Sequence, residues 1–292
     1  DSSDGKFKKS AFEVVSYGKK VAEQLGTTVA VITINASDVS ELYTYGAEKV
    51  LTVSNEQLKT FNAKGYTSVL QQAATAENAS IVVLDSSINV LHVAPMLAVA
   101  MNAGYASNVV ALPSEVAPFT IKRKAFSNKG FSNTVMNTEN KIIGVAKNSY
   151  GVHENPVSGT SESFDVSISE SDFGVTSEKV EKASGKVTIA DADSVVSAGR
   201  GLKGPENWGM IEELAEVLGA ATACSKPVSD LGWRPHGEHV GQTGKPVASN
   251  LYIAIGISGA IQHLAGINAS KVKVVINTDP EAPFFKAADY GI

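Results

Sequence analysis

Three glycines near residue 200 have the spacing of a turn that can hold a phosphate group. Gly199 to Gly204 reads Gly-x-Gly-x-x-Gly, the pattern of dinucleotide-binding turns, and it lies between an apolar run and an expected helix. The first turn of a helix attracts an anion because its N–H groups have no partner within the helix. An ordinary tight turn would also need these glycines, so both interpretations stay open, and Arg200 favours an anion ligand.

A second candidate site lies where Ser258 and Gly259 precede a short apolar segment. The Ser258 hydroxyl can cap a helix there or donate to a phosphate oxygen. His263 follows about one turn later, although a lone histidine on an apolar helix is more often a core residue than a ligand. The loop from Val240 to Gly244 has glycines that let its backbone approach a flat ligand closely, and the alternative there is an ordinary polar turn.

Two other patterns do not support catalysis or metal binding. The segment Gly256–Ala260 resembles the nucleophile elbow of hydrolases, but Ala260 replaces the second glycine and His263 is too near in sequence to act as the base. His236 and His239 could share a metal ion, yet they lie in an expected solvated loop and no third ligand is evident. We therefore expect neither a hydrolase nor a metal site.

These loops need a framework of alternating helices and strands. Apolar residues recur at helical spacing from Ser10 to Leu25, which predicts an amphipathic helix ended by Gly26. Continuous apolar runs predict strands, separated by helices, at Thr28–Ile34, Lys49–Val53 and Ser80–Leu84. This alternation indicates a parallel α/β sheet. Because the first readable element is a helix, we expect a strand ahead of Asp1 that this chain lacks.

From Phe119 on, the hydrophobic pattern changes from alternating helices and strands to successive strands. We expect antiparallel strands at Thr120–Phe126, Gly130–Met136 and Lys141–Ala146. Residues 155–186 are rich in Ser and Glu, and we place the domain boundary near Gly185. The prediction is therefore an N-terminal Rossmann-like domain over 1–185, a parallel sheet with antiparallel additions, and a C-terminal Rossmann-like domain over 186–292.

The second domain is expected to repeat a strand–turn–helix unit. A strand at Asp193–Ser197 precedes the glycine turn, and Pro205 stands at a first helical position. A second strand at Leu251–Ile257 precedes Ser258 and a helix over Ala260–Ala265, and a third strand is expected at Lys273–Asn277.

Composition bounds the class of protein. The chain has 292 residues, which suits two domains, and 43% of them are hydrophobic against 19% charged, which indicates folded cores. The formal net charge of −5 and the lack of a basic run argue against nucleic acid as a partner. The single Cys224 excludes an internal disulfide and favours a reducing compartment such as the cytoplasm. The longest uncharged run, Pro246–Ser270, is interrupted by glycines and Gln262, so we expect no membrane span.

Four ordered blocks of the chain closely resemble the C-terminal domain of the electron-transfer flavoprotein alpha subunit. They are Val195–Lys203, Val240–Lys245, Leu251–Gly266 and Asn277–Pro283. The first domain is more weakly similar to the N-terminal domain of that family, including the segment Tyr45–Val50. The resemblance implies an α/β fold and one FAD, held in a heterodimer with the electron-transfer flavoprotein beta subunit.

The resemblance further implies an electron carrier, not an enzyme that converts a substrate. Electrons would come from flavin dehydrogenases, such as those acting on acyl-CoA, and would pass to a membrane quinone oxidoreductase. Such a carrier works in the bacterial cytoplasm or the mitochondrial matrix. The residues that the resemblance implies at the FAD are Arg200, Gly201, Ser225, Lys226, Val240, Gly241, Gln242, Thr243, Gly244, Ser258, Gly259, Ala260, Ile261, Gln262, His263, Asn277 and Asp279.

Within that set the resemblance implies different roles. The helix at Gly259 would face the diphosphate, Asn277 the adenosine end, and Thr243 the flavin N5. His263 could donate to the pyrimidine carbonyl of the flavin. Lys226 stands where many members of the family have arginine, which keeps the positive charge but loses the planar fork of donors.

Two other functions remain as alternatives. An NAD-dependent oxidoreductase would use Gly199–Gly204 as a true dinucleotide turn, but it would also need an acidic residue after the second strand, and no convincing one is present. A non-catalytic nucleotide-binding scaffold is the third interpretation. The absorption spectrum of the purified protein distinguishes a flavoprotein from both alternatives.

Overall fold

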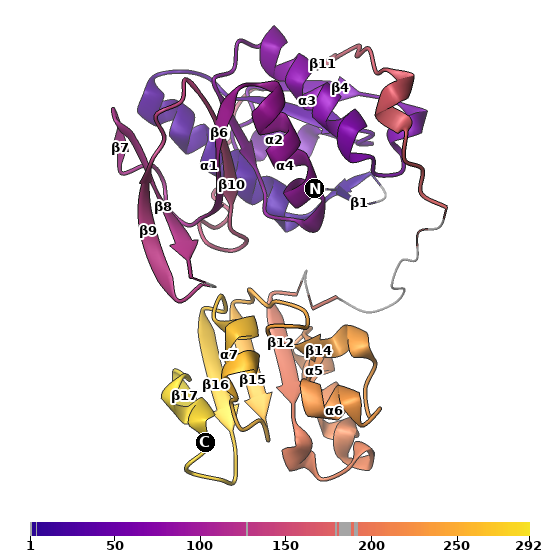
Figure 1. Cartoon of the computed structure of the whole chain (residues 1–292), viewed down its shortest axis with the longest axis vertical. Coiled ribbons are helices and arrows are strands. Elements are labelled where there is room, and N and C mark those ends of the chain that lie inside the picture. Colours follow the sequence, from indigo (N-terminus) through magenta and orange to yellow (C-terminus); the bar gives the residue numbers. More distant parts are fainter. Residues whose placement is uncertain (1, 4, 127, 179, 181–187, 190–191) are drawn as a thin grey trace. The chain divides into compact units, whose positions relative to one another are not determined.

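The computed structural model describes residues 2–3, 5–126, 128–178, 180, 188–189 and 192–292, which form two compact units. The first unit comprises 1–126 and 130–180, and the second comprises 127–129 and 181–292 (Figure 1). Gly185 lies outside the described residues, so the domain boundary placed there stays a prediction. Among the residues that the structure describes, no helix is long and apolar enough to cross a bilayer.

The first unit combines helices with two parallel-containing sheets. Its helices are α1 (Lys9–Leu25), α2 (Ser40–Thr44), α3 (Ala63–Ala76) and α4 (Ile88–Ala100). Its strands are β1 (Ser2–Ser3), β2 (Lys6–Phe7), β3 (Ala30–Ile34), β4 (Lys49–Val53), β5 (Ile81–Leu84), β6 (Ala103–Val109), β7 (Glu115–Val116), β8 (Phe119–Ala125), β9 (Gly130–Val135), β10 (Asn140–Val145) and β11 (Thr160–Ser163). The larger sheet has the order β5-β10-β6-β8-β7, with β9 paired to β8, and the smaller sheet has the order β11-β4-β3.

The sequence pattern predicted most of these elements. The helix expected at Ser10–Leu25 is α1, and Gly26 ends it in the left-handed conformation with φ 65°. The strand expected at Lys49–Val53 is β4, and the other two early strands differ from β3 and β5 only at their first residues. The parallel arrangement of β3 with β4 confirms the expected α/β architecture.

One predicted strand runs the other way. We expected Lys141–Ala146 to be antiparallel, but β10 pairs in parallel with both β5 and β6. Ile142 is buried beside α4, whereas Ile143 is buried beside α1, so β10 is covered on both faces. A strand of that kind has a continuous apolar run and belongs in the middle of a parallel sheet. The antiparallel prediction holds for β8 and β9 only.

The Ser- and Glu-rich region also contributes a strand that the pattern did not predict. Strand β11 pairs in parallel with β4, from Thr160 opposite Lys49 to Ser163 opposite Thr52. All of its side chains are exposed, so no apolar pattern marks it in the sequence. Its position at the edge of the smaller sheet explains how a polar segment can form a strand.

The second unit is a single doubly covered sheet. Its strands are β12 (Ser194–Ala198), β13 (Ala221–Ser225), β14 (His239–Val240), β15 (Leu251–Ile255), β16 (Val272–Ile276) and β17 (Tyr290–Gly291), and its helices are α5 (Gly209–Val217), α6 (Lys226–Asp230) and α7 (Ile261–Ile267). The strand order is β14-β13-β12-β15-β16-β17, and every neighbouring pair is parallel. The order reverses between β12 and β15, which is the switch point where ligands of such sheets bind.

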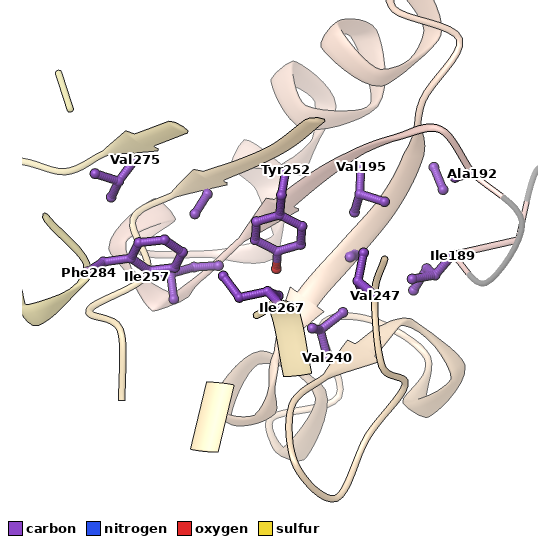
Figure 2. Packing of buried hydrophobic residues seen from close by; sticks show 13 residues of the cluster. Ile189, Ala192, Val195, Val240, Val247, Tyr252, Ile257, Ile267, Val275 and Phe284 are labelled. Carbon is purple, nitrogen blue, oxygen red and sulfur yellow. The ribbon is translucent and has the colours of Figure 1, made fainter. Parts of the chain in front are cut away.

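Both faces of this sheet are apolar. On β12, Val195 packs in one core cluster with Tyr252 and Ile267, whereas Val196 packs in another cluster with Ile211 of α5. Figure 2 shows the first cluster, with the Tyr252 ring surrounded by aliphatic side chains. Because successive residues of a strand point to opposite faces, β12 needs helices on both sides, and α7 and α5 provide them.

A groove of about 510 Å³ lies between two strand edges of the first unit. Within the described residues, β3 pairs only with β4 on one side, and β5 pairs only with β10. Both strands line the groove, together with apolar side chains of α1 such as Val15 and Val21. Each edge therefore presents unpaired backbone N–H and C=O groups toward an apolar space, and a further parallel strand has the right shape for it.

We expect an added strand in this groove to stabilise the first unit. A Val- and Ile-rich segment of about six residues, fused ahead of Asp1, should raise the midpoint of thermal unfolding by pairing with β3 and β5. A Gly- and Ser-rich segment of the same length is the control, because it cannot fill the apolar space. Equal midpoints for the two fusions would mean that the groove does not accept a strand.

Candidate functional site

All of the predicted cofactor-binding segments follow strands of the second unit at one edge of its sheet. Gly199 and Arg200 follow β12, Ser225 ends β13, and the loop from Gly241 follows β14. Ser258 lies beyond β15 and Asn277 directly follows β16. Because these strands are parallel, their carboxyl ends meet at the same edge. The tertiary structure therefore brings together loops that are far apart in the sequence.

The loop after β12 packs directly against the loop after β15. A Cβ atom at Gly201 would lie 2.5 Å from the Cα of Gly256, and one at Gly199 would lie 2.2 Å from the Gly256 carbonyl oxygen. The N–H of Gly201 donates to that same oxygen at 3.0 Å. These glycines are thus required for backbone packing, which is the ordinary-turn interpretation of the motif.

The glycine turn also leads into its helix less directly than expected. Residues Arg200–Leu202 form a 3₁₀ turn, and Pro205 begins a second one that ends at Trp208. Helix α5 starts only at Gly209. The α-helical N-terminus that should follow a dinucleotide turn at once is therefore displaced, while the Arg200 side chain stays exposed at the sheet edge.

The loop after β14 is fastened to helix α7. The N–H of Gln242 donates to the backbone oxygen of Gln262 at 2.7 Å. A Cβ atom at Gly266 would lie 2.6 Å from the Cα of Gly241, so the two backbones touch. Val240 and Gly241 are buried by this contact, whereas Gln242 and Thr243 are exposed and Gly244 is partly exposed. The loop thus exposes the Gln242 amide and the Thr243 hydroxyl to solvent while its backbone is fixed against α7.

The segment that opens α7 has the same mixture of a fixed backbone and exposed side chains. Gly259 has φ 86°, and a Cβ atom there would lie 2.5 Å from the backbone nitrogen of Phe284. That nitrogen donates to the Ser258 carbonyl at 3.0 Å. Exposed residues of this segment are Ser258, Ala260, Ile261 and Gln262. None of them is acidic, so nothing in the segment repels a phosphate.

His263 turns inward from the same segment. Its side chain is buried, and its Nε2 lies 3.0 Å from the Tyr252 hydroxyl. Burial lowers the pKa of His263 to about 4, so the imidazole is neutral at neutral pH. Its other nitrogen, Nδ1, is also buried. A backbone hydrogen bond with Val240 raises the pKa of the ring and so opposes part of the effect of burial.

The remaining predicted residues are held in different ways. Ser225 is buried as the N-terminal cap position of α6, and Lys226 is exposed and forms an ion pair with Asp230 at 3.0 Å. The amide of Asn277 donates from Nδ2 to the Ile257 carbonyl at 3.1 Å. Its Oδ1 accepts from the backbone N–H of Asp279 at 3.0 Å. Asn277 therefore connects the ends of β15 and β16.

The histidine pair between α6 and β14 differs from the sequence prediction. We expected His236 and His239 in a solvated loop, but His239 begins β14 and is buried, while His236 is exposed. Burial is the main cause that lowers the pKa of His239. In the part of the chain that the structure describes, no three histidine, cysteine or acidic side chains gather where they could hold a metal ion.

Sequence reasoning missed two residues that support this edge. Tyr252 is the only polar side chain in an otherwise aliphatic strand β15, and that contrast could have identified it. Arg234 donates to both carboxylate oxygens of Glu238, at 2.8 and 2.7 Å, and to Glu212 at 3.0 Å. Its guanidinium also lies over the Trp208 ring. These contacts join the loop before β14 to helix α5.

Comparisons with known proteins show which family this chain is similar to. The family described as "Electron transfer flavoprotein FAD-binding domain" matches residues 188–268, and the family described as "Electron transfer flavoprotein domain" matches residues 1–171. The chain is 36% identical to "Electron transfer flavoprotein subunit alpha" of Bacillus subtilis, over 99% of this chain and 90% of the relative. It is 32% identical to the protein of the same name from Thermoanaerobacterium thermosaccharolyticum, over 99% and 90%. A mitochondrial relative from Dictyostelium discoideum is 52% identical over 43% of this chain and 35% of its own length.

Two glycine substitutions should separate the site from an ordinary loop. We expect Gly259→Ala to reduce FAD retention, because the positive φ costs about 1–2 kcal/mol for an L-residue and the methyl group meets the Phe284 backbone. Gly237→Ala is the matched control, since a Cβ atom at this exposed glycine meets nothing within 4 Å. The FAD content after gel filtration and the midpoint of thermal unfolding measure both effects. Equal FAD loss in both variants would contradict the assignment of the Ser258–His263 segment.

Proposed function

Because the chain belongs to the electron transfer flavoprotein alpha-subunit family, we propose that it is the FAD-holding half of a heterodimeric electron carrier. The carrier accepts electrons from flavin dehydrogenases, such as those acting on acyl-CoA, and passes them to a membrane quinone oxidoreductase. FAD is the cofactor of the domain that matches residues 188–268. That match begins ahead of β12 and extends into the turn after α7.

The observation that carries this proposal is the meeting of five loops at the carboxyl edge of one parallel sheet. A ligand as long as FAD needs several loops in a row, and the exposed side chains Arg200, Gln242, Thr243 and Gln262 are spread over three of them. The glycines between them have no Cβ atom, so a ligand can come close to the loop backbone. The edge lies at a topological switch point, where dinucleotides bind in such folds.

Each group of residues has its own task in this proposal. The Ser258–Gln262 segment, which has no acidic side chain, offers backbone N–H groups and a hydroxyl to the diphosphate. Asn277, which hydrogen bonds to Ile257 and Asp279 hold in place, would contact the adenosine end. Thr243 and Gln242 are exposed on the fixed loop, where they can donate to the flavin ring. When bound, FAD supplies the electron-accepting and electron-donating chemistry.

The NAD-dependent alternative has less support. A dinucleotide turn needs free N–H groups at the start of a helix, but the Gly201 N–H is already bonded to the Gly256 oxygen. Helix α5 starts only after two 3₁₀ turns. A colourless protein with affinity for NAD would favour this alternative over a flavoprotein.

An exposed apolar helix supports the requirement for a partner. On α4, Ile88, Leu91 and Val99 are 71%, 54% and 85% exposed. Large apolar side chains exposed on one helix are common at interfaces. The beta subunit is the partner that the family implies, and its compartment would be the bacterial cytoplasm or the mitochondrial matrix.

We expect an obligate heterodimer. Co-expression with an untagged beta subunit should yield a one-to-one complex that carries flavin, with an interface above about 2,000 Å² in total. Co-purification, followed by absorption spectroscopy and sedimentation, measures the composition and the cofactor. A stable FAD-loaded monomer that does not bind the beta subunit would contradict the proposed partner.

The positive charge of Lys226 should raise the first-electron potential of bound FAD. Lys226→Ala removes an exposed positive charge beside β13, so the reduced flavin should lose electrostatic stabilisation and the first-electron potential should fall. The ion pair with Asp230 offsets part of this effect. Lys271→Ala is the control, because Lys271 precedes β16 and lies at the opposite edge of the sheet. Spectroelectrochemical titration at low salt measures the potential, and unchanged values for Lys226→Ala would remove this role.

A further inference from the structure

His239 is a buried histidine that the proposed function has not used. It is the first residue of β14, and it is only 2% exposed. The parallel pairing of β14 with β13 places His239 opposite Cys224, so its backbone is fixed to the sheet. The loop that carries Gln242 and Thr243 begins directly after this short strand. His239 therefore lies where the sheet passes into one of the predicted cofactor loops.

The imidazole of His239 lies against both glycines of that loop. A Cβ atom at Gly244 would lie 2.9 Å from its Nδ1, and a Cβ atom at Gly241 would lie 3.4 Å from its Nε2. The carbonyl oxygen of His239 also accepts the N–H of Lys245 at 2.8 Å, which closes the loop. The loop backbone thus packs against the ring of His239 as well as against α7.

This packing suits a neutral imidazole and disfavours a charged one. The Nδ1 atom of His239 is buried, and none of the residues that the structure describes forms a hydrogen bond with it. A neutral imidazole can leave Nδ1 without a proton, whereas the charged form carries an N–H on both nitrogens. A buried N–H without an acceptor is unfavourable. Protonation of His239 therefore requires the Gly244 end of the loop to move, so that water can reach Nδ1.

The groups around His239 also affect its charge. Burial is the main cause that lowers its pKa, and the charges of His236 and Lys226 act in the same direction, while Asp230 opposes them. His263 of α7 also interacts with it, but burial lowers the pKa of His263 to about 4, so that ring titrates at lower pH. The other titratable residues beside β14 are Cys224, Arg234, Glu238 and Lys245.

We propose that His239 is a positioning residue for the cofactor site: its neutral imidazole supports the loop from Gly241 to Gly244, which holds Thr243 beside the flavin, and its protonation releases the loop. This inference rests on the proposed function for the identity of the ligand and for the place of Thr243 beside it. The support of the loop rests on the contacts of His239 alone.

The sign of the pH dependence follows from the packing. The packed loop takes up the proton less readily than the open loop, because burial lowers the pKa of His239 from its ordinary value of 6.5. The packed form is therefore fully favoured above that ordinary value, and it becomes less stable as the pH falls below it. Acidification should open the loop and weaken the binding of FAD.

The support of the loop can be measured without FAD. The backbone N–H groups of Gln242, Gly244 and Lys245 are all hydrogen-bonded, so their hydrogen exchange reports on opening of the loop. In the heterodimer freed of flavin, their exchange relative to the intrinsic rate should increase between about pH 7.5 and pH 5.5. In His239→Gln it should be the same at both pH values, because the amide does not titrate there. His239→Asn is a second neutral variant with the same expectation.

The affinity for FAD tests whether the loop acts on the cofactor. One proton is taken up when the loop opens, so the dissociation constant of the parent heterodimer should rise with acidification by at most about tenfold per pH unit. His239→Gln should bind FAD equally well across the same range. His236→Gln is the matched control at an exposed histidine, and its affinity should fall with pH as in the parent. Equilibrium titration followed by flavin fluorescence measures these constants.

The outcomes separate the two proposals. Equal pH dependence in the parent and in His239→Gln, or a parent that shows none, would overturn the positioning role. A heterodimer that binds no FAD at any pH would contradict the proposed function, while hydrogen exchange would still decide whether His239 supports the loop. A merely structural role would lower the midpoint of thermal unfolding of His239→Gln without changing either pH profile, and this result would also overturn the proposal.

Discussion

Backbone contact between loops is the constraint on which the candidate site depends. A parallel sheet delivers the loops after all its strands to one edge, so those loops must fit against one another. Gly201 meets Gly256, and Gly241 meets Gly266, at distances that no Cβ atom could occupy. These main-chain contacts fix the loops. The fixed backbone then limits where the exposed side chains of the loops can lie. A site built in this way can hold a long ligand with few charged residues.

Burial of polar groups is the second organising feature of this unit. Tyr252 and His263 share a hydrogen bond in the core, and Arg234 is surrounded by two carboxylates and the Trp208 ring. Each arrangement offsets the cost of removing a polar group from water. Burial also lowers the pKa of His263 far below neutral pH, so its imidazole is neutral.

The first unit also contains parallel strands, but it exposes apolar side chains and strand edges. Strand β10 lies between β5 and β6 with helices over both faces, as a central strand requires. The edges of β3 and β5 border an apolar groove, and α4 exposes Val99 to solvent. Exposed apolar surface of this kind is typical of protein interfaces. The first unit therefore carries the open apolar surfaces, and the second carries the loops of the candidate site.

The sequence by itself determined the alternation of helices and parallel strands, because apolar periodicity records which residues are buried. It also identified the segments of the candidate site, since glycines beside hydroxyl and amide residues stand directly after apolar runs such as Leu251–Ile255. It did not determine the direction of β10, because pairing depends on strands distant in the chain. Nor did it reveal strand β11, whose exposed side chains carry no pattern. Only the tertiary structure decided that Gly199 and Gly201 serve backbone packing, and that His239 and His263 are buried, because both depend on neighbours brought together by folding.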